Sequence, residues 1–246
     1  MENRKIKIGY EIVDDIALDK YVDLSKTCHW LVCGGSGSGK SVFMMYVLNQ
    51  LLNTDITLYI GDFKGSGDYT ALSPKYAEFG DCVALIEEFY EQYQYIKQNK
   101  TGKHILIILD EYAGMLVWLE GQDKKKATEI KGKMAEILMQ GRSLPGGGSA
   151  WCFCILQRAD ASYFSFGARL NFMLSVGFSR LDKETKIMLG FNSDDIPLDY
   201  EPCTGKALIS IDGESLSILQ VPTVPVDKLR KLLCKKAERR NGVAVS

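Results

Sequence analysis

Hydrophobic residues along the chain form two kinds of pattern: short continuous runs, and longer stretches with apolar positions three or four residues apart. The continuous runs predict buried strands at His29–Cys33, Asp55–Gly61, Ile105–Leu109, Trp151–Leu156 and Asn171–Phe178. The spaced stretches predict helices over Val42–Leu52, over Val83–Gln98 and within Glu120–Arg142. Strands that alternate with helices predict an α/β domain with a mostly parallel central sheet flanked by helices, and with ligand-binding loops at the carboxyl ends of the strands.

Both ends of the chain have shorter patterns. Alternating residues in Lys5–Leu24 predict short N-terminal strands, and alternation in Gly205–Val221 predicts a C-terminal hairpin. The residues after Lys235 are polar, and we expect them to fray. The chain is therefore expected to have three parts: a short β lead-in at 1–26, one α/β domain at 27–226, and a C-terminal helix with a polar tail at 227–246.

Composition places the chain among ordinary globular proteins, with 46% hydrophobic and 25% charged residues in a length of 246. No apolar run approaches the roughly 18 residues of a membrane helix, and Met1–Lys7 is too polar for a signal peptide. We therefore expect a cytoplasmic protein without a membrane span of its own. A formal net charge of −1 gives no general attraction for nucleic acid, so any contact with DNA must come from local patches.

Cysteines, histidines and basic clusters are expected to have structural roles. None of the seven cysteines forms a C-x-x-C pair, so we expect reduced, mostly buried thiols. His29 and His104 adjoin apolar runs, which favours a structural role over metal binding. A solvated charged face is the favoured interpretation of three basic clusters: Lys124–Lys126; Lys183 with Lys186; and Lys235, Lys236, Arg239 and Arg240.

One glycine-rich segment carries a specific chemical pattern. The segment Gly34-Gly35-Ser36-Gly37-Ser38-Gly39-Lys40-Ser41 fits G-x-x-x-x-G-K-[ST], and it lies between a predicted strand and a predicted helix. Glycines there let backbone N–H groups surround phosphates, and the helix N-terminus adds partial positive charge. Lys40 would reach the β- and γ-phosphates, and the Ser41 hydroxyl would ligate Mg²⁺. A plain flexible turn or a dinucleotide fingerprint is the alternative, but the Lys40-Ser41 pair favours a triphosphate site, with ATP and Mg²⁺ as ligands.

Two adjacent acids follow the most aliphatic strand. Asp110 and Glu111 come directly after the five aliphatic residues Ile105–Leu109. Asp110 is placed to hold the magnesium ion, and Glu111, one residue further on, to act as the general base toward water. A pair of surface acids after a core strand is the alternative. Together with the phosphate loop, the pair predicts a hydrolysis site.

Two further residues are candidates for the same site. Gln157 ends the strand Trp151–Leu156, where its amide could hydrogen-bond the attacking water and the γ-phosphate, although a polar strand end needs no function. Arg142 ends the amphipathic stretch, where the carbonyls of the helix C-terminus could satisfy it. The alternative role for Arg142 is an arginine finger supplied to a neighbouring subunit. The residue pattern alone leaves both questions open.

Taken together, these motifs resemble the motor domain of the FtsK/SpoIIIE family, within the FtsK–HerA group of ring ATPases. The resemblance covers about Ile6–Val221. It rests on Val22–Ser41, with its histidine before the strand, on Asp62-Phe-Lys64 (similar to D-x-K), on Leu109–Ala113 (similar to D-E-[FY]-A) and on Leu156-Gln-Arg158 (similar to T-Q-R).

The resemblance implies a RecA-like P-loop fold, a homo-hexameric ring, ATP sites between subunits and translocation of double-stranded DNA. Lys40, Ser41, Asp110, Glu111 and Gln157 would then keep the roles above, and Arg142 matches the arginine before the next strand. The sequence resembles the compact versions of mobile elements, which predicts a motor for conjugation coupling or packaging, with a membrane-anchored or relaxase-type partner. A secretion-type ATPase that moves protein and a nucleotide-dependent interaction module are the alternatives.

The sequence departs from the family pattern in three respects. Pro145–Gly148 looks like an addition after Arg142, and Glu184 or Lys186 stands where the family has an arginine. The family's membrane-spanning part, the domain before its motor and its winged-helix module are not recognised in the chain. The sequence therefore predicts a bare motor.

Overall fold

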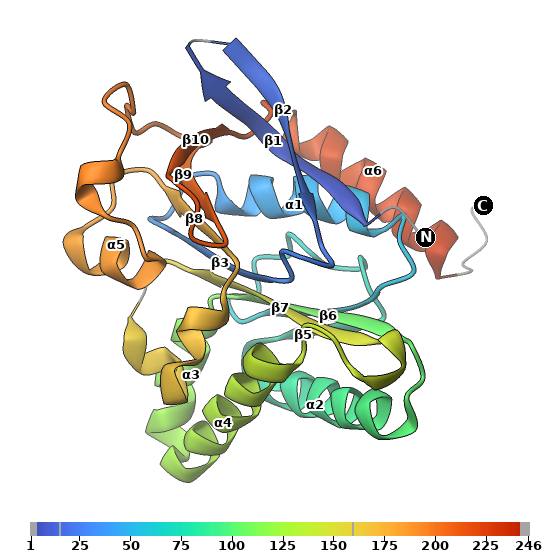
Figure 1. The fold of residues 1–246 in the computed structure, drawn as a ribbon. Coiled ribbons are helices and arrows are strands. Elements are labelled where there is room, and N and C mark those ends of the chain that lie inside the picture. The colour runs from blue at the N-terminus through green and yellow to red at the C-terminus, as the bar shows by residue number, and fades with distance from the viewer. Residues whose placement is uncertain (1–3, 15, 159, 242–246) are drawn as a thin grey trace.

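The computed structural model describes residues 4–14, 16–158 and 160–241, and these form a layered α/β fold (Figure 1). Ten strands of the described chain make one sheet, in the order β2-β1-β10-β9-β8-β3-β7-β6-β4-β5. The strands are β1 (Lys5–Val13), β2 (Ile16–Asp23), β3 (His29–Gly34), β4 (Thr57–Asp62), β5 (Lys75–Glu78), β6 (His104–Asp110), β7 (Ser149–Leu156), β8 (Leu174–Phe178), β9 (Lys206–Ile211) and β10 (Ser217–Gln220).

The sheet has a parallel part and an antiparallel part. Strands β8, β3, β7, β6, β4 and β5 pair in parallel. Strands β9, β10, β1 and β2 continue the sheet with antiparallel pairings, so the C-terminal hairpin joins the N-terminal strands to the core. The predicted mostly parallel central sheet, the N-terminal strands and the C-terminal hairpin are confirmed.

Helices cover both faces of this sheet. They are α1 (Lys40–Leu51), α2 (Cys82–Asn99), α3 (Tyr112–Gln122), α4 (Lys124–Gln140), α5 (Lys183–Leu189) and α6 (Val226–Arg240). Helices α1 and α6 pack on one face, and α2, α3 and α4 on the other (Figure 1). Every residue of β3, β6 and β7 is buried, because these strands lie in the middle of the sheet with helices on both sides. No helix in the described ranges is long and apolar enough to span a membrane.

The register of the parallel strands gathers their carboxyl ends at one edge. Asp62 of β4 pairs with Asp110 of β6, and Asp110 pairs with Ile155 of β7. On the other side of β7, Leu156 pairs with Cys33, next to the start of the glycine-rich loop. The loops that follow β3, β4, β6 and β7 therefore surround the same region.

The C-terminal helix corrects one expectation. Helix α6 continues to Arg240, so the residues after Lys235 are not frayed as far as the described chain extends. Lys236 Nζ donates to the carbonyl of Asn49 (2.8 Å), and Arg240 Nη1 donates to that of Leu51 (3.0 Å). These bonds satisfy carbonyl groups at the end of α1, and they stabilise the last turn of α6 against that helix.

Candidate nucleotide-binding and hydrolysis site

The glycine-rich loop links the end of β3 to the start of α1, as its sequence predicts. Gly34 and Gly39 have φ angles of +155° and +109°, which residues with a side chain rarely adopt. A Cβ atom on Gly34 would lie 2.7 Å from Cβ of Phe178, and one on Gly39 would lie 3.1 Å from the backbone nitrogen of Gly205. The loop therefore needs glycine both for its conformation and for its packing against the neighbouring strands.

Lys40 begins α1 and lies within the loop. Its Nζ atom donates to the carbonyl oxygens of Gly34 (2.6 Å) and Gly35 (2.8 Å). Burial lowers the pKa of Lys40, while the nearby carboxylates of Asp110 and Glu111 raise it. The ammonium group thus lies between the loop backbone and the two predicted acids.

Asp110 ends β6 inside the molecule, with only 9% of its surface exposed. The pKa of Asp110 is raised to about 6, mainly by burial and also by the nearby carboxylates of Asp62 and Glu111, while a hydrogen bond from Tyr69 partly opposes this rise. Its surroundings disfavour the charged form of the carboxyl group, and a bound cation would stabilise that form.

Glu111 has an unusual backbone conformation. Its φ and ψ angles are 62° and 42°, in the left-handed region, and it caps the N-terminus of α3. Its N–H donates to the carbonyl of Ile155 (3.0 Å). A left-handed conformation costs a residue with a side chain about 1 kcal/mol, and such strain is often found at functional sites. The turn directs the chain away from the sheet directly after Asp110.

The loop after β4 places further residues, to which the sequence pattern assigned no role, against the acids of the site. Lys64 Nζ lies 2.9 Å from a carboxylate oxygen of Glu111. The Tyr69 hydroxyl donates to Asp110 (3.0 Å), and both the backbone and the hydroxyl of Ser66 donate to Asp62 (2.8 Å each). The sequence signal for Lys64 was its place in the D-x-K segment. Tyr69 had no comparable signal, since a tyrosine in a turn-rich loop is commonly exposed.

These elements surround a cleft of about 240 Å³. Its lining includes Ser36–Val42 of the loop and helix together with Lys64, Ser66, Asp110, Gln157 and Thr204. The predicted phosphate loop, Asp110 and Gln157 therefore share one cleft. A second, more apolar cleft of about 240 Å³ shares Gly39, Val42 and Thr204 with the first and continues along Gln220–Val224.

The residues present fit a magnesium ion. Mg²⁺ prefers oxygen ligands and usually binds through one or two protein groups together with phosphates and water. Ser41 and Asp110 offer such oxygens, and both line the same cleft near the Tyr69 hydroxyl, which donates to Asp110. The Oδ1 atom of Asp62 is buried and has no hydrogen-bond partner in the described chain, which suits a neighbouring hydrated cation. In the described part of the chain, no group of three or more His, Cys, Asp or Glu side chains could hold a metal ion by itself.

Arg142 is not part of this cleft. It is exposed, and it lies between the end of α4 and the start of β7, whereas Gln157 follows the other end of that strand. A strand of eight residues spans about 26 Å, so Arg142 lies at the opposite edge of the sheet. Its guanidinium group makes no hydrogen bond or ion pair with other described residues, so the alternative in which helix carbonyls satisfy Arg142 is not observed.

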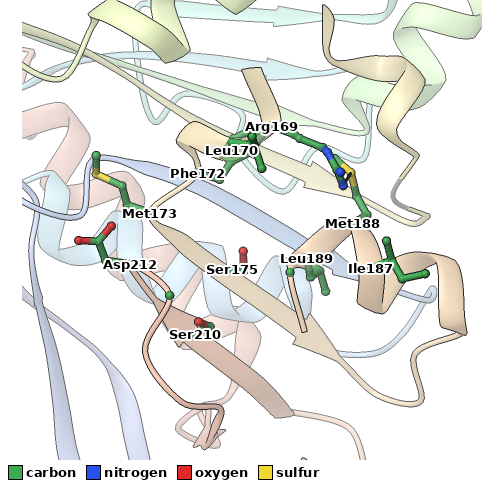
Figure 2. Close-up of a pocket in the computed structure, with 12 residues that line it drawn as sticks. Arg169, Leu170, Phe172, Met173, Ser175, Ile187, Met188, Leu189, Ser210 and Asp212 are labelled. Carbon is green, nitrogen blue, oxygen red and sulfur yellow. Dashed lines mark hydrogen bonds between the residues drawn. The ribbon is translucent and has the colours of Figure 1, made fainter. Parts of the chain in front are cut away.

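Another cavity, of about 280 Å³, lies at this opposite edge (Figure 2). It lies near the amino end of β8, and its lining includes Met173, Ser175, Met188 and Asp212. Arg169 reaches across toward the sulfur of Met188 (4.0 Å). None of the predicted site residues lines this cavity.

The histidines and cysteines have structural surroundings. His29 is fully buried, and its Nδ1 accepts a hydrogen bond from the N–H of Cys152 (3.2 Å). Nδ1 of His104 bonds to the hydroxyl of Ser149 (2.8 Å). All seven cysteines are free thiols, and five of them are buried, as expected. In the basic clusters, Lys126 pairs with Glu87 and Glu129, in agreement with a charged surface, whereas Lys236 and Arg240 are partly buried and donate to main-chain carbonyls, which differs from the expected solvated face.

Comparisons with known proteins relate both the sequence and the fold to FtsK-like ATPases. No model of a known protein family matches the chain. The FtsK domain-containing protein YdcQ of Bacillus subtilis (strain 168) is 25% identical over 221 residues, which cover 81% of this chain and 44% of YdcQ. The chain therefore spans less than half the length of this curated relative.

Three solved structures show the same fold. The conjugation coupling protein TcpA of pCW3, with ATPγS, matches 94% of this chain and 70% of its own, with a TM-score of 0.69 and 20% identity. EssC (ATPases 2 and 3) from Geobacillus thermodenitrificans matches 98% of this chain and 50% of its own, with a TM-score of 0.71 and 16% identity. The DNA-packaging ATPase B204 of Sulfolobus Turreted Icosahedral Virus matches 81% of this chain and 100% of its own, with a TM-score of 0.54 and 15% identity. The chain therefore has the same fold as these ATPases, and its sequence is similar to that of an FtsK-domain protein.

Proposed function

We propose that this chain is a motor subunit that hydrolyses ATP and uses the energy to move double-stranded DNA, in the conjugation or packaging of a mobile element. The observation that carries the proposal is the single cleft where the phosphate loop meets Asp110 and Gln157, with Glu111 beside it. Proteins of similar fold include a conjugation coupling protein and a DNA-packaging ATPase, which supports the choice of DNA as the substrate that is moved.

Each residue of the cleft has a role in the proposed hydrolysis. The loop N–H groups and Lys40 bind the β- and γ-phosphates. Glu111 accepts a proton from the attacking water, and the Gln157 amide orients that water against the γ-phosphate. Ser41 and Asp110 would hold Mg²⁺, which would neutralise charge on the phosphates. Lys40 Nζ, which donates to the carbonyls of Gly34 and Gly35, would exchange these acceptors for phosphate oxygens.

The apolar cleft beside Gly39 receives the base of the nucleotide. It adjoins the phosphate cleft through Gly39, Val42 and Thr204, so a nucleotide with its phosphates on the loop can extend into it. Val42, Pro222 and Val224 offer apolar contacts to the flat faces of a base. The base would therefore be held mainly by apolar contacts and burial.

The position of Arg142 favours a ring of identical subunits, a homo-hexamer in the proposed motor. An arginine at the edge opposite the phosphate loop cannot reach the ATP of its own chain, but it can reach that of a neighbour stacked edge to edge. Arginine fingers supplied from a neighbour raise phosphoryl-transfer rates by factors of about 10³ to 10⁵. This arrangement would make hydrolysis depend on assembly.

The test is the ATPase rate of the wild-type chain with and without duplex DNA, with Lys40→Ala as the control for contaminating activity. The proposal predicts a rate that rises with DNA and is absent in Lys40→Ala. A rate that ignores DNA but rises with a partner protein would favour a secretion-type ATPase, in line with the similar fold of EssC. Nucleotide binding without any hydrolysis would favour an interaction module instead.

A further inference from the structure

The loop Phe63–Tyr69 connects β4 to the region of β5 and lies against both acids of the site. Near its beginning, Lys64 forms an ion pair with Glu111. Within the described chain, Lys64 is the only hydrogen-bonding or ion-pair partner of the Glu111 carboxylate. The side chain of Glu111 is 13% exposed and that of Lys64 is 44% exposed, so the pair lies where the cleft meets solvent. The direction of the Glu111 side chain therefore depends on Lys64.

At the end of this loop, Tyr69 contacts the other acid, Asp110, through a hydrogen bond. Tyr69 is fully buried, and its hydroxyl donates to Oδ2 of Asp110 at 3.0 Å. Ser41, the serine of the phosphate loop, lies close enough to the same hydroxyl to influence the pKa of Tyr69. The Tyr69 hydroxyl is thus bonded to one of the two residues that are proposed to hold Mg²⁺ and is near the other.

The loop is held in place by contacts of its own. Ser66 donates two hydrogen bonds to Asp62, the last residue of β4. Asp68 forms an ion pair with Arg230 of α6, on the face of the sheet that carries α1. These contacts fix the middle of the loop, so Lys64 and Tyr69 project from a backbone that is tied to the sheet and to a helix.

We propose that the loop Phe63–Tyr69 positions both acids of the site, with Lys64 directing the carboxylate of Glu111 and Tyr69 that of Asp110. This inference rests on the proposed hydrolysis of ATP. Lys64 and Tyr69 act through the acids and are positioning residues. A water-activating carboxylate must be held within a fraction of an ångström of its productive geometry, and the strained turn at Glu111 provides a fixed backbone but no fixed side chain.

For Lys64, the experiment compares Lys64→Met and Lys64→Arg with the wild type in steady-state ATP hydrolysis and in ADP binding. Lys131→Met is the matched control, because Lys131 also pairs with a glutamate, Glu120 at 2.6 Å, but on α4 away from the cleft. We expect Lys64→Met to lower kcat at least about tenfold with ADP affinity unchanged, and Lys64→Arg to restore most of the rate. The control should behave as the wild type.

A double-mutant cycle shows whether Lys64 acts through Glu111. In the Glu111→Gln background, single-turnover hydrolysis should lose nothing more when Lys64→Met is added. Independent losses that multiply, or an ADP affinity that falls with Lys64→Met alone, would make Lys64 a phosphate ligand and overturn its positioning role. An unchanged kcat in Lys64→Met would overturn it too.

For Tyr69, the readout is the affinity for ADP as a function of Mg²⁺ concentration, which needs no hydrolysis. We expect Tyr69→Phe to raise the half-saturating Mg²⁺ concentration about tenfold, with ADP affinity in EDTA unchanged. The matched control is Tyr93→Phe, whose buried hydroxyl donates to Glu136 at 3.0 Å on the far side of the molecule.

A Mg²⁺ dependence like that of the wild type, or a tighter one, would contradict positioning by Tyr69, since a tighter one would mean that the hydroxyl competes with the cation. A wild type that binds ADP but does not hydrolyse ATP would refute the proposed function. The Tyr69→Phe result would still decide the positioning inference in that case.

Discussion

At the scale of single residues, Glu111 combines the features expected of a reacting group. It is in a strained turn, it directly follows Asp110, and its carboxylate pairs with Lys64; both of these neighbours line the phosphate cleft. Strain of this kind persists only where the surrounding structure enforces it, here through the bond from the Glu111 N–H to the Ile155 carbonyl. This geometry supports the proposed role of Glu111 as the general base.

Replacing Glu111 by glutamine tests this role. We expect Glu111→Gln to lower the rate of ATP hydrolysis by about 10² or more, because the amide cannot accept a proton from water, while ADP affinity stays close to that of the wild type. The measurements are steady-state hydrolysis and nucleotide titration, with Glu120→Gln, an exposed acid of α3, as the control. Hydrolysis at the wild-type rate would show that another group is the base.

His29 should make the protein sensitive to mild acid. Burial and, to a smaller extent, the positive charge of Arg142 lower the pKa of His29 to about 3. Between this value and the unfolded pKa of about 6.5, the unfolded chain binds a proton that the folded chain excludes, so stability falls as the pH falls.

The measurement is the free energy of unfolding against pH for the wild type and for His29→Asn, whose side-chain oxygen can accept the Cys152 N–H. From pH 6.5 to 5.5, we expect the wild type to lose about 1 kcal/mol more than the variant. Asp110, whose pKa is about 6, titrates in the same window in both proteins, so its contribution cancels in the comparison. Parallel curves for the two proteins would mean that His29 is accessible to protons in the folded state.

At the scale of elements, the pattern of apolar residues located most helices and strands but missed α3, α5 and β5. Helix α3 is apolar along most of its length and contains two glycines, so it has no clear polar face. Helix α5 has seven residues and β5 has four, which are too short for a period to be recognised. These elements exist because the sheet and its neighbours give them a surface to cover.

Helix α6 provides a test of how the C-terminal element is held. Arg240 donates to the carbonyls of Leu51 and Ile56, at the end of α1 and beyond it, and is partly buried. We expect Arg240→Met to lower the free energy of unfolding by about 1 to 3 kcal/mol, because buried carbonyls lose charged donors while the apolar stem is kept.

Denaturant unfolding with a shared slope is the measurement, and Arg239→Met is the matched control, since Arg239 lies one residue earlier and is exposed. Equal stability of the two variants would show that the last turn of α6 contributes nothing to the fold.

At the scale of the whole molecule, the two edges of the sheet carry different candidate site residues. The phosphate loop, Asp110, Glu111 and Gln157 lie at the carboxyl edge, and Arg142 lies at the other. Such a division fits a subunit whose site is completed by the next subunit. It also explains why Arg142 is exposed and without a hydrogen-bonding partner within the described chain.

Mixing variants tests this arrangement. Arg142→Ala and Lys40→Ala chains should each hydrolyse ATP slowly, because one lacks the finger and the other lacks the phosphate lysine. Mixed together with DNA, they should recover activity, since some interfaces then pair an intact loop with an intact arginine. The check is the ATPase rate across mixing ratios. A mixture no faster than the mean of its parts would argue that Arg142 acts within its own chain or not at all.

The sequence by itself determined the features that depend on neighbouring residues: the phosphate loop between a strand and a helix, the acids after an aliphatic strand, and the alternation that gives an α/β fold. Local backbone preference and burial act over a few residues, so they leave a pattern in the sequence. Only the tertiary structure decided the strand order, the joining of β1 to β10, the opposite position of Arg142, and the contacts of Lys64 and Tyr69 with the acids. Those depend on pairings between residues far apart in the chain, such as Tyr69 and Asp110, which no local pattern specifies.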